Sequence, residues 1–366
     1  MKAKFIPLIA VLAILCSCTP SKTNEGYEDY DWTALEKRLE NPIKIPIDTM
    51  LDVSMKMRTL GDKVLMECPY RQVLYELKDN RLQYKNVFIK EGQGPLEVLT
   101  GANVNRMNDG RFVAIEPGGS KKIFVSRTAD EKELEDISTW HSFIRQDEVT
   151  EYFCQTLLPI NDTLLLGSAL GNCPSKFVVN NLNTGESVPL NYSFPEVLDN
   201  LADFAKTFAL DGRMYKKPDE NKYVYYCLTG LYSFIFDYQD GKMENMKYIF
   251  NQPAAYESRG EKARPRLCDG KSVYAADCYV AKEHIYYSNR RATVEDVFKL
   301  ETTFEGYPYY YTREFIVFDW NGKPVRKYVL DRMVSDFFVD EDESIFYGMT
   351  IDSPDSEEEY LVAYKL

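Results

Sequence analysis

The sequence has little histidine, few cysteines and no excess of positive charge. Of its 366 residues only His141 and His284 are histidines, and no Cys-x-x-Cys occurs. A zinc or haem site needs clustered imidazole or thiolate ligands, so we predict no metal site and no cofactor. Lys and Arg number 44 against 57 Asp and Glu, a formal net charge of −13. So acidic a chain repels nucleic acid, which argues against a nucleic-acid-binding function.

No apolar run is long enough to span a membrane. The apolar stretch at residues 5–15 has eleven residues, whereas a spanning helix needs about 20. It follows Lys2 and Lys4 and is typical of the central part of a secretory signal. Leu15-Cys16-Ser17-Cys18 resembles a bacterial lipobox, with Leu at −3 and a small residue at −1. We therefore predict a signal peptide at residues 1–17 and a lipid anchor on Cys18.

The remainder divides into a short polar segment and one domain. Residues 18–40 begin with a polar stretch that has no periodic apolar face, which predicts a flexible tether. Residues 41–366 form the predicted domain. Six cysteines follow Cys18, and an oxidising compartment would permit disulfides. The pairs closest in sequence are Cys154–Cys173 and Cys268–Cys278; buried thiols are the alternative.

Aromatic residues are abundant and recur in a hairpin pattern. The 27 Tyr and 20 Phe favour pleated, half-buried strands. Residues 232–250 turn at Asp240-Gly241, and residues 314–330 turn at Asn321-Gly322. These dipeptides are the strongest short hairpin signals, because both central residues of a type I′ turn need positive φ. Weaker copies turn at residues 79–80, 129–130 and 184–185.

The spacing of these turns predicts an all-β, six-bladed β-propeller. Successive turns lie 50, 55, 56 and 81 residues apart, and a four-stranded blade needs about 40–50 residues. The longest interval indicates an insertion between Arg290 and Thr312. Residues 336–366 supply only three strands of a sixth blade. Because a missing strand would leave an open edge, we expect residues 43–48 to close the ring as its fourth strand.

Two segments resemble a known family. Gly92-Gln93-Gly94-Pro95-Leu96-Glu97 is similar to the Gly-x-Gly-Pro-x-Glu loop of the TolB-like six-bladed propeller lipoproteins of Bacteroidetes. Residues 318–324 and 340–348 resemble the end of these proteins as well; one departure is Leu96, where the family usually has Gly. The resemblance implies a propeller in the cell envelope and says little about function. Thr19-Pro20-Ser21-Lys22 lacks the acidic cluster of surface-displayed relatives. The periplasmic face of the outer membrane is therefore expected, with surface exposure left open.

The predicted ligand-binding residues cluster in and around the insertion of the fifth blade. Tyr and Arg are enriched in binding hot spots, and here they stand in an otherwise acidic chain. The candidates are Arg264, Arg266, Arg290, Arg291, Tyr307, Tyr309, Tyr310, Tyr311 and Arg313. Such a surface suits an acidic glycan or an envelope protein; ordinary strand tyrosines are the alternative.

A second candidate is an acid–base pair. Asp277 and His284 flank one strand and could serve a hydrolase or lyase near the axis. The main hypothesis from the sequence is a lipid-anchored binding module of the cell envelope, whose ligand is an unknown glycan or envelope protein. The alternative is a propeller hydrolase or lyase that acts on a glycan or small metabolite in an axial pocket.

Overall fold

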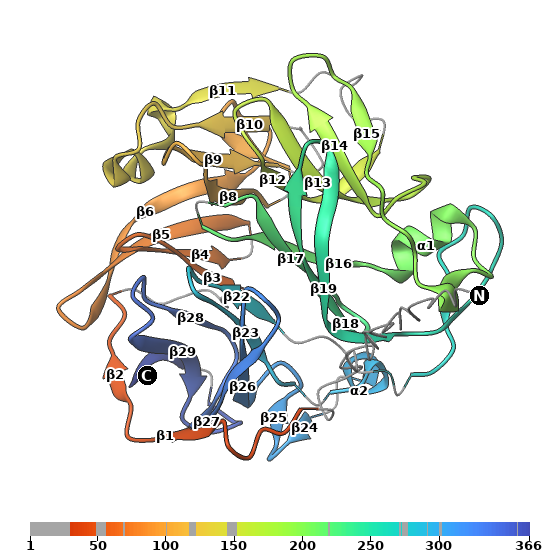
Figure 1. Ribbon diagram of the computed structural model, residues 1–366. Coiled ribbons are helices and arrows are strands. Elements are labelled where there is room, and N and C mark those ends of the chain that lie inside the picture. Colours follow the sequence, from red (N-terminus) through yellow and green to blue (C-terminus); the bar gives the residue numbers. More distant parts are fainter. Residues whose placement is uncertain are drawn as a thin grey trace, which may run out of the picture.

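The computed structural model describes twelve ranges of the chain. They are residues 30–48, 56–68, 70–99, 101–116, 122–144, 152–218, 220–270, 272, 277–290, 292–299, 302–356 and 358–366. Within them, six sheets are arranged in a ring (Figure 1). The predicted signal peptide, Cys18 and Arg291 lie outside the described residues.

Each of the six sheets is one blade of a propeller. Blade one contains β3 (Lys56–Leu60), β4 (Lys63–Cys68), β5 (Arg71–Lys78), β6 (Arg81–Glu91) and β7 (Glu97–Val98). Blade two contains β8 (Asn103–Arg106), β9 (Phe112–Ile115), β10 (Lys122–Val125) and β11 (His141–Ile144). Blade three contains β12 (Phe153–Pro159), β13 (Leu164–Leu170), β14 (Phe177–Asn181) and β15 (Ser187–Pro189).

The last three blades are built in the same way, each with its first strand innermost. Blade four contains β16 (Gly212–Lys216), β17 (Lys222–Cys227), β18 (Gly230–Gln239) and β19 (Lys242–Pro253). Blade five contains β22 (Cys278–Val280), β23 (His284–Ser288), β26 (Thr312–Asp319), β27 (Pro324–Val334) and β1 (Glu36–Leu39). Blade six contains β28 (Phe337–Val339), β29 (Ile345–Ile351), β30 (Glu359–Lys365) and β2 (Ile43–Ile45).

Helices and small hairpins occupy only the connections. The helices are α1 (Asp203–Ala209), α2 (Val294–Lys299) and the 3-10 turns η2 (Glu131–Glu135), η3 (Ile137–Thr139) and η5 (Glu196–Leu198). The two small hairpins are β20 (Tyr256–Glu257) with β21 (Arg266–Leu267), and β24 (Thr302–Phe304) with β25 (Tyr307–Pro308). No helix in the described ranges has the length and apolar character to cross a membrane.

The core lies between the blades, because central strands bury both of their faces. In β17, Tyr223 and Tyr225 pack with blade three, whereas the alternating Val224 and Tyr226 pack with blade five. Six buried clusters result, one at each junction between neighbouring blades. Successive side chains of a strand point to opposite faces, so an unbroken apolar run is what a blade between two others requires.

Most predicted turns are confirmed, and blade two is the exception. Asp79, Asn80, Asp240 and Gly241 all have positive φ, as a type I′ turn demands. The hairpin at Asn321-Gly322 forms as well, but there only Gly322 has positive φ, so its turn is not of type I′. The predicted hairpin at residues 129–130 is wrong. After β10 the chain enters η2 and η3, where Asp130 and Asp136 cap the two turns, and the fourth strand of the blade is β11. A short polar stretch with Asp at both caps favours 3-10 turns over a strand.

The ring is closed by the N-terminal strand, as predicted. Ile43 and Ile45 of β2 lie opposite Ala363 and Leu361 of β30. The chain then crosses to blade one, where Ile47 forms an isolated bridge with Leu82. Residues 43–47 therefore connect the last blade to the first.

The segment before the closing strand packs against the domain. Tyr30 and Trp32 are buried in the cluster between blades four and five, and the Tyr30 hydroxyl donates to Ile249 O at 3.0 Å. Strand β1 then pairs in parallel with β27. The chain thus packs against the domain before residue 41, where the predicted domain begins, because the rings of Tyr30 and Trp32 are buried in an apolar cluster.

The cysteines form none of the predicted disulfides. Neither Cys154 and Cys173 nor Cys268 and Cys278 are bonded to each other. Cys268 is exposed, and the other five cysteines of the domain are buried. The buried thiols act as small apolar side chains of the core.

Candidate functional site

Charged side chains from four blades meet where the innermost strands begin. We call this end of the axis the start end, and the end where each innermost strand turns into the second strand the turn end. Lys56 opens β3 of blade one, Asp277 directly precedes β22 of blade five, and Asp336 directly precedes β28 of blade six. The axial cluster is defined as Lys56, Arg58, Arg213, Tyr215, Asp277, Arg290 and Asp336.

Lys56 extends across the ring to the opposite blade. Its ammonium donates a hydrogen bond to the hydroxyl of Tyr215 on β16 of blade four. The guanidinium of Arg58 lies 5.8 Å from the centroid of the same ring. Because blades one and four face each other in a ring of six, Tyr215 and Lys56 meet at the axis.

Asp277 is held between two cations. Its carboxylate lies 2.8 Å from the guanidinium of Arg290 and 3.8 Å from the ammonium of Lys56. Arg290 also donates to the carbonyl of Ser335 at 2.9 Å, which brings it beside Asp336. Burial alone would raise the pKa of Asp277, but the charges of Arg290 and Lys56 outweigh it and lower this pKa.

Asp336 behaves in the opposite way. Its side chain is buried and accepts a hydrogen bond from the backbone N–H of Met57. Burial, together with the negative charge of Asp277, raises the pKa of Asp336 to about 7, against the attraction of Lys56. Burial likewise lowers the pKa of Lys56, and the carboxylates only partly offset it. Two neighbouring carboxyl groups thus have pKa values shifted in opposite directions.

Several donors in the cluster have no partner. The Nε atoms of Arg58 and Arg290 are buried and make no hydrogen bond within the described structure. Arg213 is exposed on β16 and forms no ion pair with any described residue, although its charge acts on Asp277. Four cations face Asp277, Asp336 and Glu67, which pairs with Arg58 at 3.1 Å. An excess of positive charge therefore collects at the axis of an acidic protein.

The innermost strands of blades two and three add further unpaired polar atoms. Asn105 Nδ2 on β8 and Gln155 Oε1 on β12 are buried without a partner in the described structure. An unpaired buried polar group costs about 1–3 kcal/mol, so a set of them calls for an explanation such as a ligand.

The residues predicted from the sequence are spread over three places. Arg264 is exposed and lies over the ring of Phe208 in α1, 4.7 Å from the centroid, and Arg266 is exposed on β21. Arg290 is part of the axial cluster, which the prediction did not anticipate. Arg313 pairs with Glu305 at 3.2 Å.

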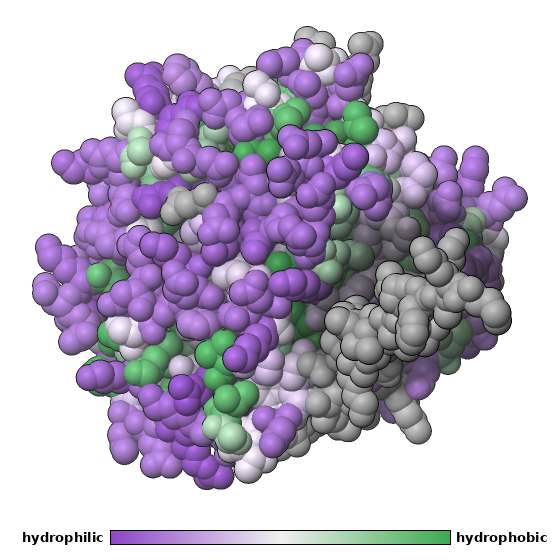
Figure 2. Space-filling model, in the orientation of Figure 1, coloured by the Kyte–Doolittle hydropathy of each residue, from purple (hydrophilic) through white to green (hydrophobic). Residues whose placement is uncertain are grey.

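The four tyrosines lie together, against blade six. Tyr311 is buried with Met333 and Ile351, and its hydroxyl donates to Glu359 at 3.3 Å. The rings of Tyr309 and Tyr310 are 5.4 Å apart, and those of Tyr310 and Tyr311 are 5.1 Å apart. Figure 2 shows that apolar surface on the viewed face of the ring occurs only in small separate areas.

Asp277 and His284 do not form an acid–base pair. Asp277 pairs with Ser288 at one end of β23, and His284 opens the same strand at the other end. His284 instead contacts Glu343 of blade six, with 2.6 Å between Nδ1 and Oε2. This hydrogen bond raises the pKa of His284. His284 and Glu343 line a depression of about 880 Å³ at the turn end, which Asp340 and Asp342 also line.

The loop with the Gly-x-Gly-Pro-x-Glu pattern is a structural turn between blades one and two. The Glu97 carboxylate accepts from the backbone N–H of Gly94 at 2.8 Å. The Lys122 ammonium donates to the carbonyl of Gly94 at 2.5 Å and to that of Glu97. Its charged groups are therefore already used within the chain.

The axial cluster was missed because its members are far apart in the sequence. Lys56 and Asp336 each occur in short segments of ordinary composition, and neither belongs to a motif. Asp336 stood at the start of a predicted strand of the sixth blade, whereas no strand that begins at Lys56 was predicted.

The fold and one direct comparison identify the family. Residues 53–342 match the family described as TolB-like 6-blade propeller-like. The chain belongs to this family. Among solved structures, the chain resembles a protein named as exported from Bacteroides fragilis, with a TM-score of 0.52 and 11% identity. That comparison covers 90% of this chain and 98% of the other.

A second solved structure matches over a similar extent. A member of the duf4221 family from Bacteroides vulgatus has a TM-score of 0.52 and 13% identity, over 89% of this chain and 96% of the other. At such low identity these likenesses describe the fold alone. Comparison with curated protein sequences finds no match.

Proposed function

We propose that this TolB-like propeller is an exported, lipid-anchored protein of the cell envelope that binds an acidic ligand at the start end of its axis. The observation that carries the proposal is the surplus of guanidinium groups there. Arg213 has no ion-pair partner in the described structure, and Arg290 keeps an unpaired Nε. The lipobox at Cys18 and the exported B. fragilis protein support the location.

The chemistry of the cluster selects a carboxylate. Guanidinium groups bind planar carboxylates through paired hydrogen bonds, and such charge-assisted bonds are about twice as strong as neutral ones. The ring of Tyr215, which contacts Lys56 and stacks against Tyr226, adds apolar surface beside these donors. A sugar acid combines both properties, with a carboxylate for the arginines and C–H groups for the apolar surface.

The first test uses two sugars that differ only at C6, where one has a carboxylate and the other a hydroxymethyl group. The chain from residue 18, with Cys18→Ser, is titrated with glucuronate and with glucose, and the thermal midpoint is followed. We expect glucuronate to raise the midpoint and glucose to leave it unchanged, because only the former carries a carboxylate. Arg213→Gln should weaken the binding about tenfold, the loss expected for one charge-assisted hydrogen bond.

Matched variants locate the site. Arg266→Gln removes an equally exposed arginine on β21 and should not affect binding. If Tyr309→Ala with Tyr310→Ala abolishes the glucuronate shift while Arg213→Gln does not, the ligand binds at the blade-five insertion instead. Absence of a shift with any sugar acid would refute an acidic ligand at the axis.

The lipid anchor is tested separately. We expect the wild-type chain to incorporate labelled fatty acid and to fractionate with membranes when it is produced with its own signal. Cys18→Ser should abolish both, whereas Cys16→Ser should retain the label. Retention of the label in Cys18→Ser would contradict the predicted site.

One observation favours a second function. The pKa of Asp336 is raised to about 7 and that of Asp277 is lowered, and such divergence is how acid and base roles are assigned in hydrolases. A hydrolase or lyase would use Asp336 as the acid and Asp277 as the base. Turnover of a glucuronide that is lost in Asp336→Asn, with binding retained, would establish it.

A further inference from the structure

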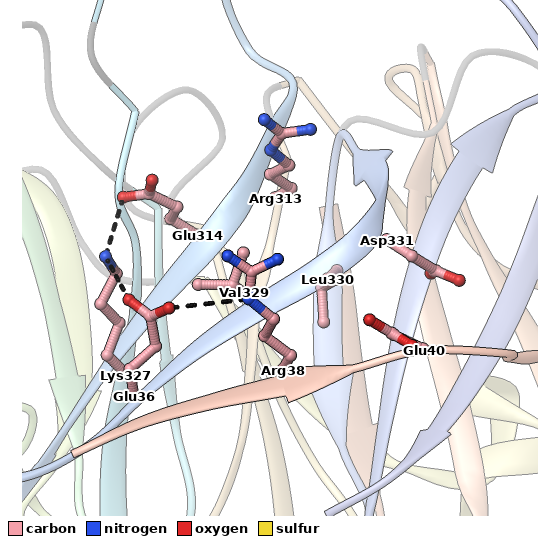
Figure 3. A pocket seen from close by; sticks show the side chains of 9 residues that line it. All are labelled: Glu36, Arg38, Glu40, Arg313, Glu314, Lys327, Val329, Leu330 and Asp331. Atoms are coloured by element: carbon pink, nitrogen blue, oxygen red, sulfur yellow. Dashed lines mark ion pairs between the residues drawn. The ribbon is translucent and has the colours of Figure 1, made fainter. Parts of the chain in front are cut away.

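A separate pocket lies on the outer edge of blade five, where the N-terminal strand is added. It has a volume of about 350 Å³ and is formed by β1, β26 and β27 (Figure 3). This volume is at the lower end of the range for small-molecule sites, so the pocket suits one small polar group. The charged side chains used below are Glu36, Arg38, Glu40, Arg313, Glu314, Lys327 and Asp331.

Charges of both signs are spread along the pocket. Lys327 is satisfied, since it lies 3.1 Å from Glu36 and 3.7 Å from Glu314. Among the residues that the structure describes, the ion-pair partner of Arg38 is Glu36 at a long 3.9 Å, and 72% of the Arg38 side chain is exposed. In Figure 3 the guanidinium of Arg38 lies in the middle of the pocket, above β1.

Two carboxylates stand at the other side. Glu40 makes no hydrogen bond or ion pair with any described residue. Asp331 accepts from the backbone N–H of Asn41 at 3.0 Å and from the Tyr364 hydroxyl at 2.6 Å, which fixes its position. A simple anion would meet these carboxylates and a simple cation would meet Arg38 and Arg313. A zwitterion can satisfy both groups at once.

The location of the pocket indicates where such a zwitterion comes from. A neighbouring groove of about 620 Å³, lined by Tyr30, Trp32 and Thr33, shares Glu36, Arg38 and Lys327 with the pocket. Tyr30 follows Cys18 by twelve residues, which span at most about 40 Å when extended. An anchor on Cys18 therefore keeps this edge of the propeller near the membrane surface.

We propose that this pocket binds the phosphoethanolamine headgroup of membrane phospholipids. The phosphate contacts the guanidinium groups of Arg38 on β1 and of Arg313 on β26, which also pairs with Glu305 at 3.2 Å. The primary ammonium donates hydrogen bonds to Glu40 and Asp331. A choline headgroup carries no N–H and cannot do so. The net charge of −13 opposes binding to anionic lipids. This inference rests on the proposed lipid anchor.

Weak affinity is sufficient for this role. Exposed ion pairs contribute little on their own, so we expect a dissociation constant in the millimolar range. A short tether raises the effective concentration of headgroups to about millimolar or higher. Headgroup binding then orients an already anchored propeller, with the edge of blade five against the membrane.

The test uses the chain from residue 18 with Cys18→Ser, so that binding does not depend on lipidation. It is sedimented with vesicles of phosphatidylcholine alone, and of phosphatidylcholine mixed equally with phosphatidylethanolamine or phosphatidylglycerol. We expect the bound fraction to be highest with phosphatidylethanolamine. Arg38→Gln should lower that binding about fivefold, equivalent to about 1 kcal/mol. Glu40→Gln should reduce the preference for phosphatidylethanolamine over phosphatidylcholine.

Lys37→Gln is the matched control, because it removes one charge from the same strand at a residue that does not line the pocket. Equal binding to all vesicles, or equal loss in Lys37→Gln and Arg38→Gln, would overturn the proposal. Binding of free phosphoethanolamine without any vesicle preference would overturn the membrane as its source. Because these measurements use no lipidated protein and no sugar acid, failure here is distinguishable from failure of the axial site or the anchor.

Discussion

At the scale of single residues, the ionisable groups of the two ends of the axis work differently. At the start end, Asp336 is buried near another carboxylate, and its pKa rises to about 7. At the turn end, His284 and Glu343 form one contact between neighbouring blades, and Tyr286 donates to the same carboxylate at 2.8 Å. Ionisation of Asp336 is therefore unfavourable in the folded protein, whereas the contact of His284 with Glu343 holds blades five and six together.

Asp336 should make the stability of the propeller depend on pH. Its pKa is about 7 in the folded protein and near 3.9 in an unfolded chain. Between these values the folded state binds the extra proton, so the contribution of Asp336 to stability falls as the pH rises. Relative to wild type, Asp336→Asn should therefore gain a few kcal/mol, up to about 4, between pH 4 and 8. Urea unfolding at several pH values measures this, and parallel stability curves would contradict it.

The contribution of His284 to stability should also fall as the pH rises, but by a smaller amount. Its raised pKa means that the stabilising contact is fully present below the ordinary value and is lost as the pH rises through the folded value. Because 31% of its side chain is exposed, we expect His284→Gln to cost no more than about 1 kcal/mol at pH 6. The cost should shrink at pH 9. His141→Gln changes an exposed residue and serves as the control.

At the scale of elements, strand β2 carries the closure of the ring. Ile45 is fully buried between blades one and six, whereas 58% of Ile43 is exposed. Both residues lie on the same strand and pair with β30, so substituting each in turn isolates the effect of side-chain burial. Ile45→Ala should destabilise the protein by about 2–4 kcal/mol, and Ile43→Ala by less than about 0.5 kcal/mol. Denaturant unfolding measures both, and similar losses would show that packing of β2 contributes little.

Elements also show where prediction from the sequence succeeds. The repeats in blades one and four have turn residues that tolerate positive φ, such as Asp240 and Gly241, so their hairpins were predictable. The structure of blade two was not predictable, because Asp130 caps the 3-10 turn η2 instead of forming the turn of a hairpin. The axial cluster could not be assembled from the sequence, since the contact of Lys56 with Tyr215 depends on how the ring closes. Arg290 was selected for its residue type, although its partner Asp277 had been assigned to a different site.

At the scale of the whole molecule, every blade shares a buried cluster with both neighbours. Because each blade is packed on both sides, no half of the ring can unfold without exposing the buried clusters of the other half. Unfolding should therefore be one cooperative transition. The tryptophans test this, because Trp140 lies between blades one and two and Trp32 lies between blades four and five. Variants that retain only Trp140, or only Trp32, should have the same fluorescence midpoint. Two separate midpoints would mean that the two sides of the ring unfold independently.

The strand that closes the ring also sets the order of events during biosynthesis. Strand β2 is made at the beginning of the domain and its partner β30 at the very end, with Ile45 opposite Leu361. A chain that still lacks β30 cannot complete the last blade, whatever its other hairpins do. For the export proposed above, this arrangement would be favourable, because the ring cannot close before the last strand has arrived. On the proposed export route, pairing of β2 with β30 would therefore be a step that follows passage through the channel.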